Sequence, residues 1–276
     1  MSRPVPYFHV DAFATAPLKG NQAAVMLLDA WPDDALMQAV AAENMFAETA
    51  YLLPDPTGAA DYELRWFTPG LEVEMCGHAT LASGHVLLDR DPALDRVRFR
   101  TRKVGVLEVA RDGAGYALSL PLVRTARGAF DAAIAHLGAG AVPSEVWTGG
   151  GYNIFLFENA DAIAALVPDY AALAGFGDQQ FICTAPGAGH PSAADVVSRV
   201  FVPGAGIDED PATGSAHSAL TAFWAPRLGR DRFTAHQASA RGADFTCRLA
   251  GDRAILGGQC VTVVEGTFLL PREFRP

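Results

Sequence analysis

The feature that most constrains this chain is an internal repeat. A shift of 134 positions places residues 65–70 on 199–204, and five of the 18 positions from 65 to 82 are then identical. In each copy an expected strand runs through Pro-Gly and an acidic loop into a helix rich in small residues. A chance match in a glycine-rich chain is the alternative. Two homologous halves related by a pseudo-twofold axis explain the pattern better.

Size and composition agree with two domains. The chain has 276 residues, of which 50% are hydrophobic and 19% are charged, so it can bury a substantial core. Strands and helices are mixed along it, and we predict an α+β protein. We place the N-terminal half at residues 1–122 and the C-terminal half at 123–265. A last strand, about residues 266–276, is expected to return to the first half.

The charge and the cysteines exclude several classes of protein. A net charge of −10 argues against a nucleic acid partner, which requires a broad basic surface. No segment resembles a signal peptide or a membrane span. The four cysteines form no CxxC pair and no zinc-like cluster with histidine, so we expect no metal and a cytoplasmic location with reduced thiols. They are Cys76, Cys183, Cys247 and Cys260.

Local patterns predict most of the elements. Alternating, β-branched and apolar runs indicate strands, and longer runs rich in alanine and leucine indicate helices. The strands are expected at 7–13, 23–28, 49–53, 62–67, two or three within 97–120, 145–147, 153–158, 196–202, 245–249, 254–256 and 261–264. The helices are expected at about 31–43, 78–88, 130–137, 161–172 and 215–224.

The starts of the two repeated helices carry the chemistry of interest. Helix N-termini offer unpaired N–H groups and partial positive charge, so two of them facing one cleft would bind an anion such as a carboxylate. Gly77 and Gly214 would let a ligand approach the backbone closely. The alternative is ordinary capping, with Asp210 as the N-cap and Pro211 in the first turn.

Several motifs together resemble one family. The segments are Gly20-Asn21-Gln22-Ala23-Ala24-Val25, Glu48-Thr49-Ala50, Arg65-Trp66-Phe67-Thr68-Pro69, Cys76-Gly77-His78-Ala79-Thr80 and Asp210-Pro211-Ala212-Thr213-Gly214-Ser215-Ala216. The chain resembles the PhzF-like (phenazine biosynthesis protein F-like) family, which is structurally related to diaminopimelate epimerase. The resemblance extends from about residue 8 to 264. It implies two domains, each a mostly antiparallel β-barrel around a central helix, with an active site in the cleft between them.

The resemblance also implies roles for particular residues. The glutamate matching Glu48 shuttles a proton, while residues matching His78, Asp210 and Ser215 bind and polarise the substrate and Gly77 contributes backbone contacts. Family members are typically homodimers without a metal or organic cofactor. Diaminopimelate epimerase has a cysteine at each helix start, whereas this chain has Cys76 at the first and, in the register of the repeat, Asp210 at the second. A two-thiol racemase is therefore doubtful.

Each of these residues has a plainer interpretation. Glu48 in an apolar cleft would suit proton transfer, yet most glutamates are solvated. Cys76 at a helix start would be acidified, or it would be a small buried residue. Asn21 is expected to bind ligand or to hold a turn, and Arg241 to bind a carboxylate of the ligand or to form a surface ion pair.

Two enzyme classes are poorly supported. No GxSxG motif accompanies a serine–histidine pair, and no GxGxxG or P-loop marks a nucleotide enzyme. We predict a cofactor-independent isomerase or epimerase acting on a small carboxylate-bearing metabolite. Its alternative is a non-catalytic metabolite-binding protein of the same fold, which would not need Glu48.

Overall fold

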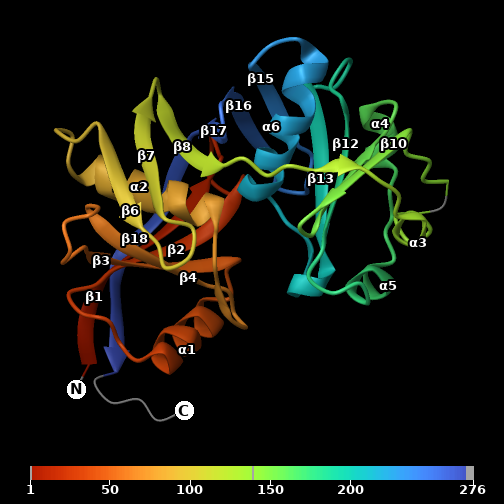
Figure 1. The fold of residues 1–276 in the computed structure, drawn as a ribbon. Helices are drawn as coiled ribbons and strands as arrows, with labels where there is room; N and C mark the ends of the chain where they lie inside the picture. The colour runs from red at the N-terminus through yellow and green to blue at the C-terminus, as the bar shows by residue number, and fades with distance from the viewer. Residues whose placement is uncertain (1, 139, 272–276) are drawn as a thin grey trace. The chain divides into compact units, whose positions relative to one another are not determined.

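The computed structural model describes residues 2–138 and 140–271, and the chain divides into two compact units. The first unit comprises residues 1–119 and 257–276, and the second comprises 120–256. The expected domain limits at 122 and 266 remain a prediction, and the part of the expected last strand beyond residue 271 lies outside the described residues. Figure 1 shows the elements of both units.

The first unit is a mixed sheet around one long helix. Its elements are β1 (Ser2–Ala12), β2 (Asn21–Leu27), α1 (Asp34–Asn44), β3 (Glu48–Pro54), β4 (Tyr62–Phe67), β5 (Glu72–Val73), α2 (Gly77–Arg90), β6 (Arg96–Arg100), β7 (Val106–Asp112), β8 (Gly115–Pro121) and β18 (Cys260–Pro271). The C-terminal strand β18 pairs antiparallel with β1, which brings the last coloured part of the chain beside the first (Figure 1).

Helix α2 is the centre of this unit. Every residue from Gly77 to Leu88 is buried, so the helix has no solvent face. It packs against β1, β2, β3, β6, β7 and β18. Its small residues permit close approach of the sheet: a Cβ atom on Gly84 would lie 2.4 Å from a methyl carbon of Val109. A helix that is apolar and small all round is expected in such a fully buried place.

The second unit repeats this plan. Its elements are β9 (Ala126–Arg127), α3 (Asp131–Ile134), β10 (Glu145–Gly149), β11 (Tyr152–Leu156), α4 (Ala160–Ala164), α5 (Tyr170–Ala174), β12 (Gln180–Pro186), β13 (Val196–Val202), a 3-10 turn (Pro203–Ala205), β14 (Ile207–Glu209), α6 (Gly214–Leu228), β15 (Arg232–Gln237), β16 (Ala243–Ala250) and β17 (Arg253–Gly258).

Strand pairing follows the same order in both units. In the first, β1 is antiparallel to β2, β2 parallel to β3, β3 antiparallel to β4, and β4 antiparallel to β5 and parallel to β6. In the second, the series β10, β11, β12, β13, β14 and β15 has the same directions. The predicted internal repeat is therefore present as a repeated topology.

An ion pair repeats with the strands. Arg65 on β4 donates from Nε and Nη2 to the two carboxylate oxygens of Glu72 on β5, at 2.7 Å each. Arg199 on β13 donates in the same way to Glu209 on β14, at 2.9 and 2.8 Å. The two arginines are 134 positions apart but the two glutamates are 137 apart, because the turn between β13 and β14 is three residues longer than the turn between β4 and β5. The gapless register expected from sequence is therefore wrong beyond this turn.

Two further expectations need correction. The single helix expected at 161–172 is two short helices, α4 and α5, because Pro168 lacks an N–H group and disfavours helical geometry in the residue before it. Strands β12 and β15 were not expected. Strand β12 is buried along most of its length and so lacks the alternation that marks a half-exposed strand.

Candidate active site

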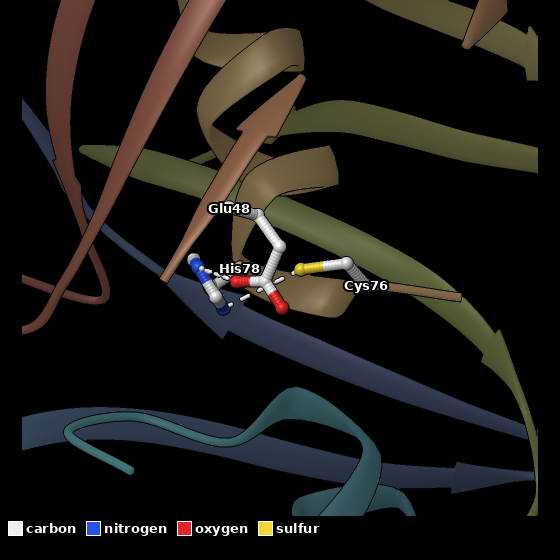
Figure 2. A group of neighbouring side chains, drawn as sticks. All are labelled: Glu48, Cys76 and His78. Carbon is white, nitrogen blue, oxygen red and sulfur yellow. Dashed lines mark hydrogen bonds and ion pairs between the residues drawn. The ribbon is translucent and has the colours of Figure 1, made fainter. Parts of the chain in front are cut away.

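Four of the predicted site residues meet at one edge of the first unit. Strands β2 and β3 run parallel, with Ala23 opposite Glu48, so both strands begin at this edge. Asn21 begins β2, Glu48 begins β3, and His78 is the second residue of α2, after its N-cap Cys76. Figure 2 shows the carboxylate, imidazole and thiol directed at one another.

A tight turn sets the start of β2. Gly20 has φ of +60°, and a Cβ atom there would lie 2.1 Å from the carbonyl oxygen of Ala12. Only glycine can take this conformation at such close approach. The turn returns the chain directly into β2 and brings Asn21, which is 1% exposed, to the imidazole.

The imidazole of His78 is the hub of the cluster. Its Nε2 lies 2.9 Å from Oε2 of Glu48. Its Nδ1 lies 3.2 Å from Nδ2 of Asn21 and 3.5 Å from Sγ of Cys76 (Figure 2 shows the glutamate and cysteine contacts). The side chain of His78 is 5% exposed and that of Glu48 is 15% exposed. The pair is thus largely withdrawn from water yet reachable at the carboxylate.

The ion pair leaves hydrogen-bonding capacity unused. Although Nε2 and Oε2 are close, they are not aligned as a hydrogen bond, and neither buried atom has another partner among the described residues. Buried polar atoms without partners are rare and often belong to ligand sites. Asn21 adds flexibility, because its amide can present either NH₂ to a neutral ring or the carbonyl to an imidazolium.

The electrostatics favour a charged imidazole and a neutral thiol. Burial alone would lower the pKa of His78, but Cys76 and the Glu48 carboxylate outweigh it and raise the pKa well above its ordinary value. Burial, followed by the charge of Glu48, raises the pKa of Cys76 to about 11. The thiol is therefore protonated at neutral pH, which favours the second of the two interpretations, a small buried residue, because desolvation exceeds any effect of the helix terminus.

The second unit has a corresponding helix start with different side chains. Helix α6 begins at Gly214 with Thr213 as its N-cap, and Ser215 occupies the place that His78 has in α2. Asp210 is thus not the N-cap, and Pro211 precedes the helix. Instead, the Asp210 carboxylate accepts a hydrogen bond from the Thr213 hydroxyl at 2.5 Å. The longer turn before β14 causes this shift in register.

Gln180 is the counterpart of Glu48. It begins β12, and the next residue pairs with Phe201, just as the residue after Glu48 pairs with Phe67. Its Nε2 donates to the Ser215 hydroxyl at 3.1 Å, and Tyr152 also hydrogen-bonds to Ser215. Sequence analysis did not select Gln180, since its strand was not expected. The gapless shift of 134 places Ile182, not Gln180, over Glu48, so the repeat did not point to it.

A second overlooked residue, Gln237, holds the loop before α6. Its side chain is fully buried at the end of β15. Its Oε1 accepts from the backbone N–H of Thr213 at 2.8 Å, and its Nε2 donates to the carbonyl of Asp210 at 2.5 Å. One amide therefore fixes both ends of the loop. A glutamine's polarity alone gives no sequence signal for such a role.

The remaining predicted residues lie on both units. Gly77 and Gly214 are the first residues of α2 and α6, and Arg241 lies half-buried in the turn between β15 and β16. The structure brings Asn21, Glu48, Cys76 and His78 into one cluster. Asp210, Gly214, Ser215 and Arg241 belong to the second unit, which is described on its own. No helix within residues 2–138 and 140–271 is long and apolar enough to cross a membrane.

The cluster of Figure 2 could also hold a metal ion. One ligand atom each from Glu48, Cys76 and His78 all lie within 4.8 Å of one another. In the described part of the chain this is the one group of three or more such side chains. Its oxygen, sulfur and nitrogen donors are those that zinc accepts.

Comparison with known proteins identifies the family. The model of the phenazine biosynthesis-like protein family, PhzC-PhzF, matches residues 10–266. An uncharacterised isomerase of Pseudomonas aeruginosa is 41% identical over 269 residues, covering 95% of this chain and 98% of the relative. The chain belongs to the PhzC-PhzF family. The predicted resemblance is thereby confirmed, and the isomerase class agrees with the names of its relatives.

Solved structures of the PhzC-PhzF family and of epimerases share this fold. A crystal structure of a PhzF family protein from Enterococcus faecalis superposes with a TM-score of 0.85 at 35% identity, covering 97% of this chain and 99% of that one. A hydroxyproline epimerase from Agrobacterium vitis, solved with bound trans-4-hydroxy-L-proline, has a TM-score of 0.63 at 16% identity, covering 97% and 93%. The second likeness shows the fold alone.

Proposed function

We propose that this PhzC-PhzF protein is a cofactor-independent isomerase that moves a proton on a small carboxylate-bearing metabolite. Glu48 transfers the proton and His78 supports the charge that forms. The proposal depends on one observation above all: a buried imidazole lies 2.9 Å from a carboxylate at the start of a helix. A carboxylate with a positively charged neighbour at a helix N-terminus is suited to general acid–base work.

The proposed reaction begins with abstraction of a carbon-bound proton by Glu48. The electrons left on that carbon delocalise into the substrate's unsaturated or carboxylate group, and the negative charge is stabilised by His78 and the N–H groups at Gly77. Protonated Glu48 then returns the proton to a second position, so no other reactant is consumed. Oε2 of Glu48 and Nε2 of His78 make no hydrogen bond among the described residues, so both atoms are available to a substrate.

The second unit would supply binding rather than proton transfer. In the proposal each half forms a barrel around its helix, the halves enclose the substrate, and the protein forms a homodimer. Gly214 and Ser215 would then bind the substrate together with Asn21, Cys76 and Arg241, while Asp210 assists catalysis. Support comes from the polar groups already gathered at Ser215 and from the hydroxyproline bound by the epimerase of similar fold. A helix N-terminus, with its unpaired N–H groups, favours a carboxylate in either unit.

The competing function is a metabolite-binding protein without chemistry. Both functions predict stabilisation by a ligand, but only the enzyme exchanges carbon-bound hydrogen with solvent. We would incubate the protein in deuterated water with a panel of cyclic, unsaturated and amino carboxylic acids and follow exchange by NMR. Exchange of at least one acid supports the isomerase. Thermal stabilisation by an acid that never exchanges would replace it with the binding protein.

A further inference from the structure

The three side chains at the start of α2 have the chemistry of a metal site as well as an acid–base site. We propose that Glu48, Cys76 and His78 bind a single zinc ion, and that the ion switches off proton transfer by occupying its residues. This goes beyond the proposed isomerisation, which uses no metal. It rests on the donor types, their spacing and their burial, and holds whether or not the isomerase activity is found.

The spacing suits a tetrahedral ion. Zinc–sulfur and zinc–nitrogen bonds of about 2.3 and 2.0–2.1 Å at tetrahedral angles put sulfur and nitrogen about 3.5 Å apart. Sγ of Cys76 lies 3.5 Å from Nδ1 of His78. One ligand atom from each of the three residues lies within 4.8 Å of the other two, so the three side chains are close enough to share one ion.

The burial also favours an ion. His78 is 4% exposed and Cys76 is 6% exposed, and Oε2 of Glu48 lacks a hydrogen-bond partner in the described residues. Binding would deprotonate the thiol and release its proton to solvent, leaving a thiolate, a carboxylate and a neutral imidazole. Two negative ligands balance the doubly charged ion, so the buried site has no net charge.

The types of donor atom favour zinc, and their identity explains why the ion would stop proton transfer. A thiolate and an imidazole favour zinc over magnesium or calcium, which prefer oxygen ligands. Three protein ligands leave a fourth position for water or the carboxylate of a ligand. The ion holds Glu48 and His78, so neither can exchange protons with a substrate. Cys76 thus acquires a role although its thiol is protonated at neutral pH.

Cobalt(II) tests the proposal without a substrate. Added to the reduced protein, it should bind one equivalent, show the visible bands of a low-coordinate ion and a near-ultraviolet thiolate-to-cobalt band, and be displaced by zinc. Cys76→Ser should abolish the near-ultraviolet band. Cys183→Ser is the matched control and should retain it, because buried Cys183 belongs to no cluster of metal-binding side chains among the described residues.

A second variant and two defined negative results complete the test. If Cys76→Ser does not fold, Glu48→Gln should keep the thiolate band while weakening cobalt affinity at least about tenfold, because one charged ligand is lost. Absence of the band in the wild-type protein, or its persistence in folded Cys76→Ser, would overturn the proposal. Spectra without substrate do not depend on catalysis. A failed exchange assay and a failed metal titration are therefore distinguishable results.

Discussion

The two units start their central helices with the same backbone but with different chemistry. In the first unit the N-cap, the second helix residue and the first residue of the neighbouring strand are Cys76, His78 and Glu48. In the second unit the same places hold Thr213, Ser215 and Gln180. The first set consists of side chains that can gain or lose a proton, whereas the second can only donate and accept hydrogen bonds.

This difference shows that the repeated framework and the chemistry are separable. The frame is held by features kept in both units, such as the forked arginine–glutamate pairs on β4–β5 and β13–β14. The chemistry depends on a few side chains at the edge of the first unit where β2, β3 and α2 begin. Asp210 is a charged exception in the second unit, but it lies before the helix and accepts a hydrogen bond from Thr213.

The largest expected effect is on the free energy of unfolding, and it should differ between the two arginine–glutamate pairs. Glu209→Gln would leave Arg199 bound to the carbonyls of Ile163 and Leu166 but without a carboxylate partner among the described residues, whereas Glu72→Gln would leave Arg65 paired with Asp34. A buried charge that loses its counter-ion is costly. We expect Glu209→Gln to lower the free energy of unfolding by about 3 kcal/mol and Glu72→Gln by about 1 kcal/mol.

Chemical denaturation of both variants would measure this difference. Asp208→Asn, at the exposed neighbour of Glu209, is the control and should leave the midpoint almost unchanged. Equal losses for the two glutamate variants would mean that Asp34 does not support Arg65. The arginine–glutamate pair would then contribute equally to the stability of both units.

The buried histidines of the two helices should respond to pH in opposite directions. Burial lowers the pKa of His217 to about 4, so its unfolded form binds more protons between about pH 6.5 and 4 and stability falls by about 3 kcal/mol as pH falls through this range. The pKa of His78 is raised, so its contribution is complete below its unfolded pKa and disappears as pH rises through the folded pKa.

Urea denaturation across pH would show both trends. His217→Asn keeps a donor for the Thr213 carbonyl and should flatten the acid side of the stability profile. His78→Asn should flatten the alkaline side only. If stability still fell at acid pH to the same extent in His217→Asn, other groups would cause the fall. The predicted difference between the two buried histidines would then be wrong.

The smallest effect is expected where the N-caps are made alike. Cys76→Thr gives α2 the N-cap of α6. Because the Cys76 thiol stays protonated at neutral pH, we expect hydrogen exchange on a responsive substrate to change by less than about tenfold. A loss of more than about a hundredfold, with the fold intact by circular dichroism, would make Cys76 a proton-transfer residue.

The sequence predicted the framework well where elements alternate or carry clear motifs. The repeat and the helix at α2 followed from the motifs. Glu48, His78 and Asn21 were selected one by one, and only the structure shows that His78 contacts the other two. The sequence did not reveal β12, because a strand buried on both faces has no alternation. It also could not reveal that burial would outweigh the helix terminus at Cys76, since desolvation depends on the whole fold.

Register was the main source of error at the site. The turn before β14, which is three residues longer than its counterpart in the first unit, breaks the gapless repeat and moves the counterpart of Cys76 from Asp210 to Thr213. Gln180 and Gln237 were overlooked for related reasons. The first lies on an unexpected strand, and the second acts through a loop that only the fold brings near.

The most direct test is to exchange the chemistry of the two units. On an acid that exchanges hydrogen with deuterated water, Glu48→Gln gives the first unit the amide of the second, while Gln180→Glu does the reverse. The account predicts that Glu48→Gln lowers the exchange rate by about a thousandfold and that Gln180→Glu leaves it within about tenfold. Exchange that survives Glu48→Gln and is lost in Gln180→Glu would contradict the assignment of proton transfer to the first unit.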